Sequence, residues 1–144
     1  MRGVPRVLLL LAALTAAATA LADERAGNLA FVLGRALYPV QLMAFCFLEV
    51  EGDPAFRDAA DGWNERNGGL FATLEAEGET AGVDDAARAS ADAAALREIE
   101  ATVSARADGA AYCHAIARLI EEGRFDIDRR EDLEAPLKRI FGKE

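Results

Sequence analysis

The neighbouring side chains best suited to chemistry in this 144-residue chain are Cys113 and His114. His114 is the only histidine, and Cys46 is the only other cysteine. A thiolate and an imidazole can act as nucleophile and base when the two side chains meet. On the helix expected over residues 110–122, however, adjacent residues point about 100° apart. This spacing argues against a catalytic pair.

The two cysteines instead predict a disulfide. Cys113 falls on the apolar side of its helix, together with Ile116 and Ile120, and Cys46 lies in an apolar segment. Two cysteines in an exported domain are expected to pair as Cys46–Cys113. The chain-entropy model assigns about 4 kcal/mol to closing a loop of about 67 residues. The alternative is two free, buried and inert thiols.

Metal and cofactor sites are not expected. A c-type haem requires Cys-x-x-Cys-His, but the residue three positions before Cys113 is Ala110. Zinc requires three or four ligands, which one histidine and two paired cysteines do not supply. The acidic residues Glu49, Glu51 and Asp53 are interpreted as a solvated helix end and a helix N-cap.

A b-type haem is the alternative function. Periplasmic cytochromes of the b562 type are helical bundles, and Met43 and His114 are the available axial couple. Against this, Met43 lies one turn from Cys46, and a disulfide would hold the α-carbons of Cys46 and Cys113 about 5.5 Å apart. The chain also lacks Gly-x-Ser-x-Gly, a phosphate loop and a Cys-x-x-Cys pair. We therefore expect no enzymatic activity.

The first 22 residues have the pattern of a secretory signal peptide. Arg2 and Arg6 precede a short apolar run, and the sequence Ala-Leu-Ala ends at Ala22. Cleavage after Ala22 predicts a periplasmic protein of a bacterium, with no transmembrane span in the mature chain, residues 23–144. The alternative is an uncleaved N-terminal anchor.

The mature chain is acidic. Residues 23–144 carry 14 basic and 25 acidic side chains, a net charge of −11. Such a charge disfavours nucleic acid and anionic membrane surfaces, because both are themselves negative. We therefore expect a protein partner, whose identity and stoichiometry the sequence does not indicate. The length fits one domain with a modest core.

The apolar spacing predicts an all-α, single-domain bundle of four to five helices, stapled by one disulfide. Apolar residues recur at three- and four-residue steps, without the alternation typical of strands. A central helix over residues 26–50 is apolar on nearly all sides, and Pro39 should kink or split it. Helices are also expected over 85–107 and 110–122, either separate or continuous.

Local signals place the other boundaries. Gly-Asp-Pro at 52–54 predicts a turn and then a helix, with Asp53 as N-cap and Pro54 in the first turn. Glycines 62, 68 and 69 predict either a bend near Asn67 or a close approach of another helix. A loop is expected over 78–83, and a short C-terminal helix follows the fourth helix.

Two groups of residues are candidates for partner binding. Phe31, Phe45 and Phe47 of the central helix either pack in the core or border a groove for a client protein. Trp63 and Asn67 either form a recognition site or, in the favoured interpretation, a core tryptophan beside a paired asparagine. The predicted function is that of a non-enzymatic, chaperone-like module that binds a protein or serves as an accessory of the cell envelope.

Overall fold

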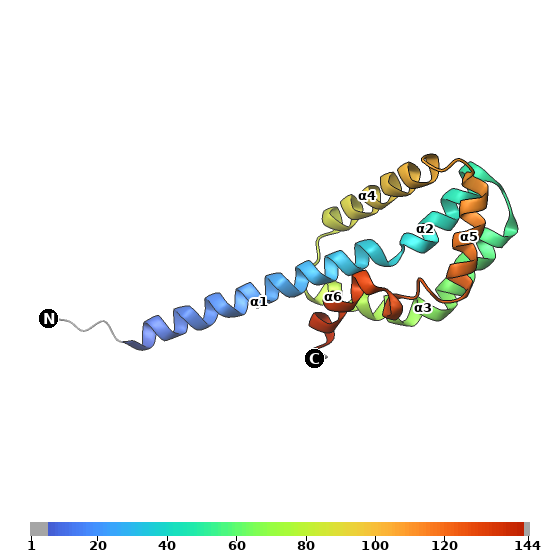
Figure 1. Cartoon of the computed structure of the whole chain (residues 1–144). Coiled ribbons are helices and arrows are strands. Elements are labelled where there is room, and N and C mark those ends of the chain that lie inside the picture. Colours follow the sequence, from blue (N-terminus) through green and yellow to red (C-terminus); the bar gives the residue numbers. More distant parts are fainter. Residues whose placement is uncertain (1–5, 143–144) are drawn as a thin grey trace.

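The computed structural model describes residues 6–142, with side chains from residue 17 onward. Within this range the elements are α1 (Arg6–Ala36), α2 (Tyr38–Phe45), the π-helix η1 (Cys46–Val50), α3 (Pro54–Thr80), α4 (Asp85–Ser104), α5 (Gly109–Glu121), the 3-10 helix η2 (Ile127–Arg129) and α6 (Glu131–Phe141). Helices α3, α4, α5 and α6 surround the second half of α1 and α2 (Figure 1). The prediction of an all-α bundle with one disulfide is confirmed.

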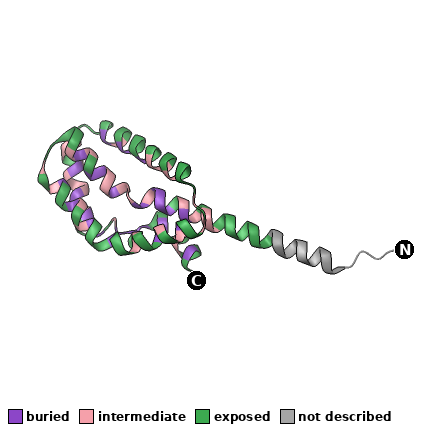
Figure 2. Ribbon diagram, turned by 180° about the vertical axis from the view of Figure 1, so that it is seen from behind, coloured by how far each residue is buried: buried purple, intermediate pink, exposed green. Residues whose placement is uncertain are grey.

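The first part of α1 projects from the bundle. Every described side chain from 17 to 24 is exposed, and burial along α1 begins only beyond them (Figure 2). Arg25 connects α1 to the bundle, because its guanidinium donates to the carbonyl oxygen of Ile140 in α6 and to the carboxylate of Glu77 in α3. Arg2, part of the predicted signal peptide, lies outside the described residues.

One segment, Ala17–Val50, is long and apolar enough to cross a membrane. In its most apolar window, 44% of the residues are buried inside the bundle. Core helices and N-terminal signal sequences both have this length and composition.

Pro39 splits the central helix, as the sequence predicts. Helix α1 ends at Ala36, and α2 begins at Tyr38 with Pro39 in its first turn, where no helical partner exists for a backbone N–H. The buried side chains of this helix pair form the middle of the core: Leu29, Val32, Leu33, Ala36, Leu42 and Met43. The core position expected for the central helix is therefore confirmed.

Helix α3 begins as predicted but ends later. The Asp53 carboxylate accepts a hydrogen bond from the Ala55 N–H at 2.9 Å, which confirms the N-cap. The loop predicted over 78–83 exists but begins later, since α3 continues through Gly78 to Thr80 and α4 begins at Asp85. Gly78 is buried, and a β-carbon there would lie 2.8 Å from Leu33 Cδ1. Packing against α1 therefore overrides the local signal for a turn.

Helices α4 and α5 are separate. Helix α4 ends at Ser104, three residues earlier than expected, and Asp108 caps α5 by accepting a hydrogen bond from the Ala111 N–H at 2.9 Å. This cap starts a new helix in a new direction. The continuous alternative is thereby excluded.

The close helix contact predicted from glycine lies at Gly34 rather than at 62, 68 or 69. A β-carbon on Gly34 would lie 2.5 Å from the β-carbon of Ala91 in α4, whereas Gly68 and Gly69 have no neighbour within 4 Å. Because the Ala91 β-carbon cannot rotate away, any side chain at position 34 must push α1 and α4 apart.

We therefore expect Gly34→Ala to lower the free energy of unfolding by about 1–2 kcal/mol, since overpacking outweighs the better helix propensity of alanine. Gly68→Ala, in open space on α3, should instead raise it by about 0.5–1 kcal/mol. Urea unfolding of both variants checks this contrast. Equal effects of the same sign would contradict the close contact.

Candidate functional site

The disulfide joins η1 to α5. Cys46 and Cys113 are fully buried and bonded, with their α-carbons 5.9 Å apart. Cys113 is thus unavailable as a nucleophile, as the helix spacing had indicated. Two of the sites described below include the chain neighbour of a bonded cysteine: a groove that includes Phe47 and a polar cluster that includes His114.

A groove of about 350 Å³ runs between the α2–η1 segment and α3. Most of its lining is apolar, and the full set is Val40, Met43, Ala44, Phe47, Leu48, Phe56, Arg57, Ala60, Asp61 and Asn64. Leu48, 73% exposed, stands at its edge. The Arg57 guanidinium lies 3.7 Å from the centre of the Phe47 ring and partly covers it.

The three candidate phenylalanines have different surroundings. Phe47 borders the groove, as expected for a partner-facing residue. Phe45 is half-buried and packs against the core, without lining the groove. Phe31 is 47% exposed on α1. Only Phe47 therefore belongs to the groove.

Trp63 and Asn67 belong to the core, which corrects their candidacy for partner binding. They are 1% and 3% exposed, so no partner reaches them in this conformation. Trp63 Nε1 donates to the carbonyl oxygen of Phe125 at 2.8 Å. Asn67 donates to Asp126 Oδ1 at 2.9 Å and accepts from the Ile127 N–H at 2.8 Å. These hydrogen bonds match the interpretation favoured from the sequence, in which Asn67 is buried and paired.

Asp126 completes this contact between α3 and the segment before η2. Arg66 binds both of its carboxylate oxygens at 3.0–3.1 Å. Burial alone would raise the pKa of Asp126, but the hydrogen bonds from Arg66 and Asn67 and the charges of Arg66 and Arg129 hold that pKa below its usual range. The carboxylate therefore remains ionised as a structural partner of Asn67.

A second, larger groove lies between α3 and the η2–α6 segment. Its volume is about 500 Å³, and its lining comprises Leu70, Thr73, Asp128, Arg129, Arg130, Glu131, Glu134, Leu137, Lys138 and Phe141. Charged side chains of both signs form the majority of this lining. The groove beside Phe47 is smaller, and apolar residues form a larger part of its lining.

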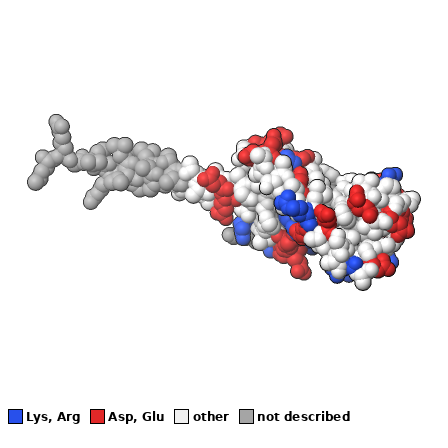
Figure 3. All heavy atoms as spheres, turned by 90° about the horizontal axis from the view of Figure 1, so that it is seen from above, with Lys and Arg blue, Asp and Glu red and all other residues white. Residues whose placement is uncertain are grey.

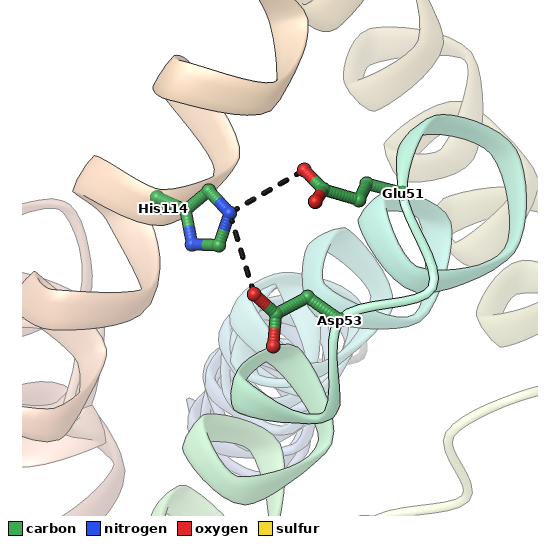
Figure 4. A group of neighbouring side chains, drawn as sticks. All are labelled: Glu51, Asp53 and His114. Carbon is green, nitrogen blue, oxygen red and sulfur yellow. Dashed lines mark ion pairs between the residues drawn. The ribbon is translucent and has the colours of Figure 1, made fainter.

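His114 faces two carboxylates across the gap between α5 and the loop before α3 (Figure 4). Its Nε2 lies 3.5 Å from Glu51 Oε2 and 3.5 Å from Asp53 Oδ2. The His114 ring also lies close to the Phe56 ring, with ring centroids 4.8 Å apart and the two planes tilted by 43°. The three polar side chains are 33–52% exposed. They form a polar site open to solvent.

The sequence interpretation missed this cluster. The local sequence favours a solvated helix end and a cap for Glu51 and Asp53, and it places His114 beside Cys113 and as a possible partner of Met43. The pairing of Cys46 with Cys113 was the available signal, because it brings residue 114 close to the chain just after residue 46. Glu49, the third acidic residue considered, is not part of the cluster.

The two residues considered for haem, Met43 and His114, have different surroundings. Met43 is 1% exposed and lines the groove between the α2–η1 segment and α3. The Nε2 of His114 points instead toward Glu51 and Asp53. Met43 and His114 therefore belong to separate sites in this structure.

The charged surface is mixed. Acidic and basic groups are interspersed with uncharged surface on the face shown in Figure 3.

Comparison of the chain with protein-family models, curated proteins and solved structures finds no significant match. Function must therefore be inferred from the geometry of the two sites.

Proposed function

We propose that this chain is an exported, non-enzymatic module that binds an apolar helical segment of another protein. The binding surface is the groove beside Phe47, between the α2–η1 segment and α3. The observation that carries the proposal is the exposure of Leu48, at 73%, at the edge of an apolar groove. Exposed apolar side chains beside an apolar cavity are typical of protein-binding sites.

The groove has the composition of an interface. Seven of its ten lining residues are apolar, and the other three are Arg57, Asp61 and Asn64. Interfaces commonly combine an apolar centre with a polar rim. An apolar side chain on one face of a partner helix would displace Arg57 from Phe47 and occupy the cavity, which is the helix-in-groove mode of recognition.

Three features support export. The first 22 residues have the signal pattern, and the described side chains before Arg25 are exposed on the projecting part of α1. Removal of residues 1–22 would leave the Arg25 contacts with α3 and α6 in place. The disulfide is compatible with an oxidising compartment such as the periplasm.

Site-specific photocrosslinking in the periplasm tests the proposal. A photoreactive amino acid replaces Leu48 in one variant and Leu96 in a matched control. Leu96 is 49% exposed but lies on α4. We expect a discrete crosslinked protein from position 48 and none from position 96.

A second substitution tests whether the groove itself is responsible. Adding Ala60→Glu, which places a charge in the groove lining, should abolish the crosslink from position 48. Equal crosslinking from positions 48 and 96, or a crosslink that survives Ala60→Glu in folded protein, would contradict the proposal.

A further inference from the structure

We propose that Glu51, Asp53 and His114 bind one divalent transition-metal ion, with zinc the best match. The ligand atoms of the three residues lie within 4.8 Å of one another. This inference does not depend on the proposed function, because it concerns a different site. The residues come from the loop before α3 and from α5 (Figure 4).

The distances suit a tetrahedral ion. Protein ligands about 2.1 Å from zinc in a tetrahedral arrangement are about 3.4 Å from one another. His114 Nε2 lies 3.5 Å from an oxygen of each carboxylate. Two of the three ligand pairs therefore already have nearly the required separation, and only a small movement of the exposed side chains would complete the set.

The backbone around the ligands is fixed. The Glu51 N–H donates to the Cys46 carbonyl oxygen at 2.9 Å, which closes the π-helix. Single π-helical turns occur frequently at functional sites. Cys46 is bonded in turn to Cys113, the neighbour of His114. One disulfide therefore fixes both sides of the site.

Two of the ligand side chains are also oriented. Asp53 uses Oδ1 to cap α3, which leaves Oδ2 directed toward His114. The Phe56 ring restricts the His114 ring from the side. Such supporting contacts reduce the reorganisation that metal binding requires.

The electrostatics favour a cation. Among the residues that the structure describes, neither Glu51 nor Asp53 has a lysine or arginine in ion-pair contact. Their shared neighbour is the imidazole, which is uncharged when it acts as a metal ligand. A divalent ion would compensate both carboxylate charges at once.

The ligand types indicate which metal. One imidazole nitrogen with two carboxylates suits zinc and similar transition metals, whereas calcium and magnesium prefer oxygen ligands alone. Three protein ligands leave a fourth position for water or for a group of a partner.

Phe56 also lines the groove beside Phe47, so the two sites share one side chain.

The test exploits the single histidine. In oxidised, ¹⁵N-labelled protein, every imidazole signal of the mature chain belongs to His114. Addition of zinc chloride should shift the Nε2 resonance at one equivalent, and calorimetry should give a stoichiometry of one. Zinc that leaves both ring nitrogens unmoved would overturn the proposal.

Substitutions separate this site from general attraction to an acidic surface. Asp53→Asn keeps a good N-cap but removes a charged ligand, and His114→Gln removes the nitrogen. Each should weaken zinc binding at least tenfold, while thermal unfolding confirms the fold. Glu49→Gln, the matched control on η1, should change the affinity less than twofold. If Glu49→Gln lowered the zinc affinity as much as Asp53→Asn, the proposed site would also be overturned.

Discussion

Replacing both Cys46 and Cys113 with alanine should lower the free energy of unfolding by about 4 kcal/mol. The bond closes a loop with a sequence separation of 67 residues, and its loss restores that conformational freedom to the unfolded chain. For a domain of this size, the melting temperature should fall by more than about 10 °C. Calorimetry of the variant beside the oxidised native protein measures both quantities.

A reductant provides the control for this prediction. Native protein unfolded in a reducing buffer should approach the stability of the double-alanine variant, and the variant itself should not respond to the reductant. A loss below about 1 kcal/mol would mean that the bond does not constrain the unfolded chain as the loop length requires.

Asn67→Ala should cost about 2–4 kcal/mol, because the substitution leaves buried polar groups without partners. The Ile127 N–H would lose its acceptor, and the Asp126 carboxylate would lose a donor. Truncation also leaves a void beside Trp63. Urea unfolding at neutral pH measures the loss.

Asn64→Ala is the matched control for Asn67→Ala. Asn64 is the same residue type on the same helix, but it is exposed, so its substitution should change stability by less than about 0.5 kcal/mol. Equal losses from the two substitutions would show that the hydrogen bonds around Asn67 contribute little.

Local signals in the sequence predicted much of the fold. Pro39 marks a helix boundary, and Asp53 caps a helix, because both effects depend on the chemistry of a few neighbouring residues. Helical periodicity predicted the fold class because it too depends on residues that lie close together in the sequence. The Cys46–Cys113 bond followed because the chain has no other cysteines.

Features that depend on distant segments were not predictable in this way. The extension of α3 through Gly78 depends on contact with Leu33, and the close contact of Gly34 depends on Ala91. The neighbourhood of His114 likewise depends on the relative rotation of α5 and the loop before α3. Periodicity gives the inward face of each helix but not which helices meet, nor at what angle.

Both proposals depend on export and on one disulfide, which holds η1 and α5 together and thereby positions the groove wall and the site at His114. The most direct test is an intact-mass measurement, under non-reducing conditions, of the protein recovered from a bacterial periplasm. The expected result is the mass of residues 23–144 less two hydrogens. A full-length mass with two free thiols would contradict it.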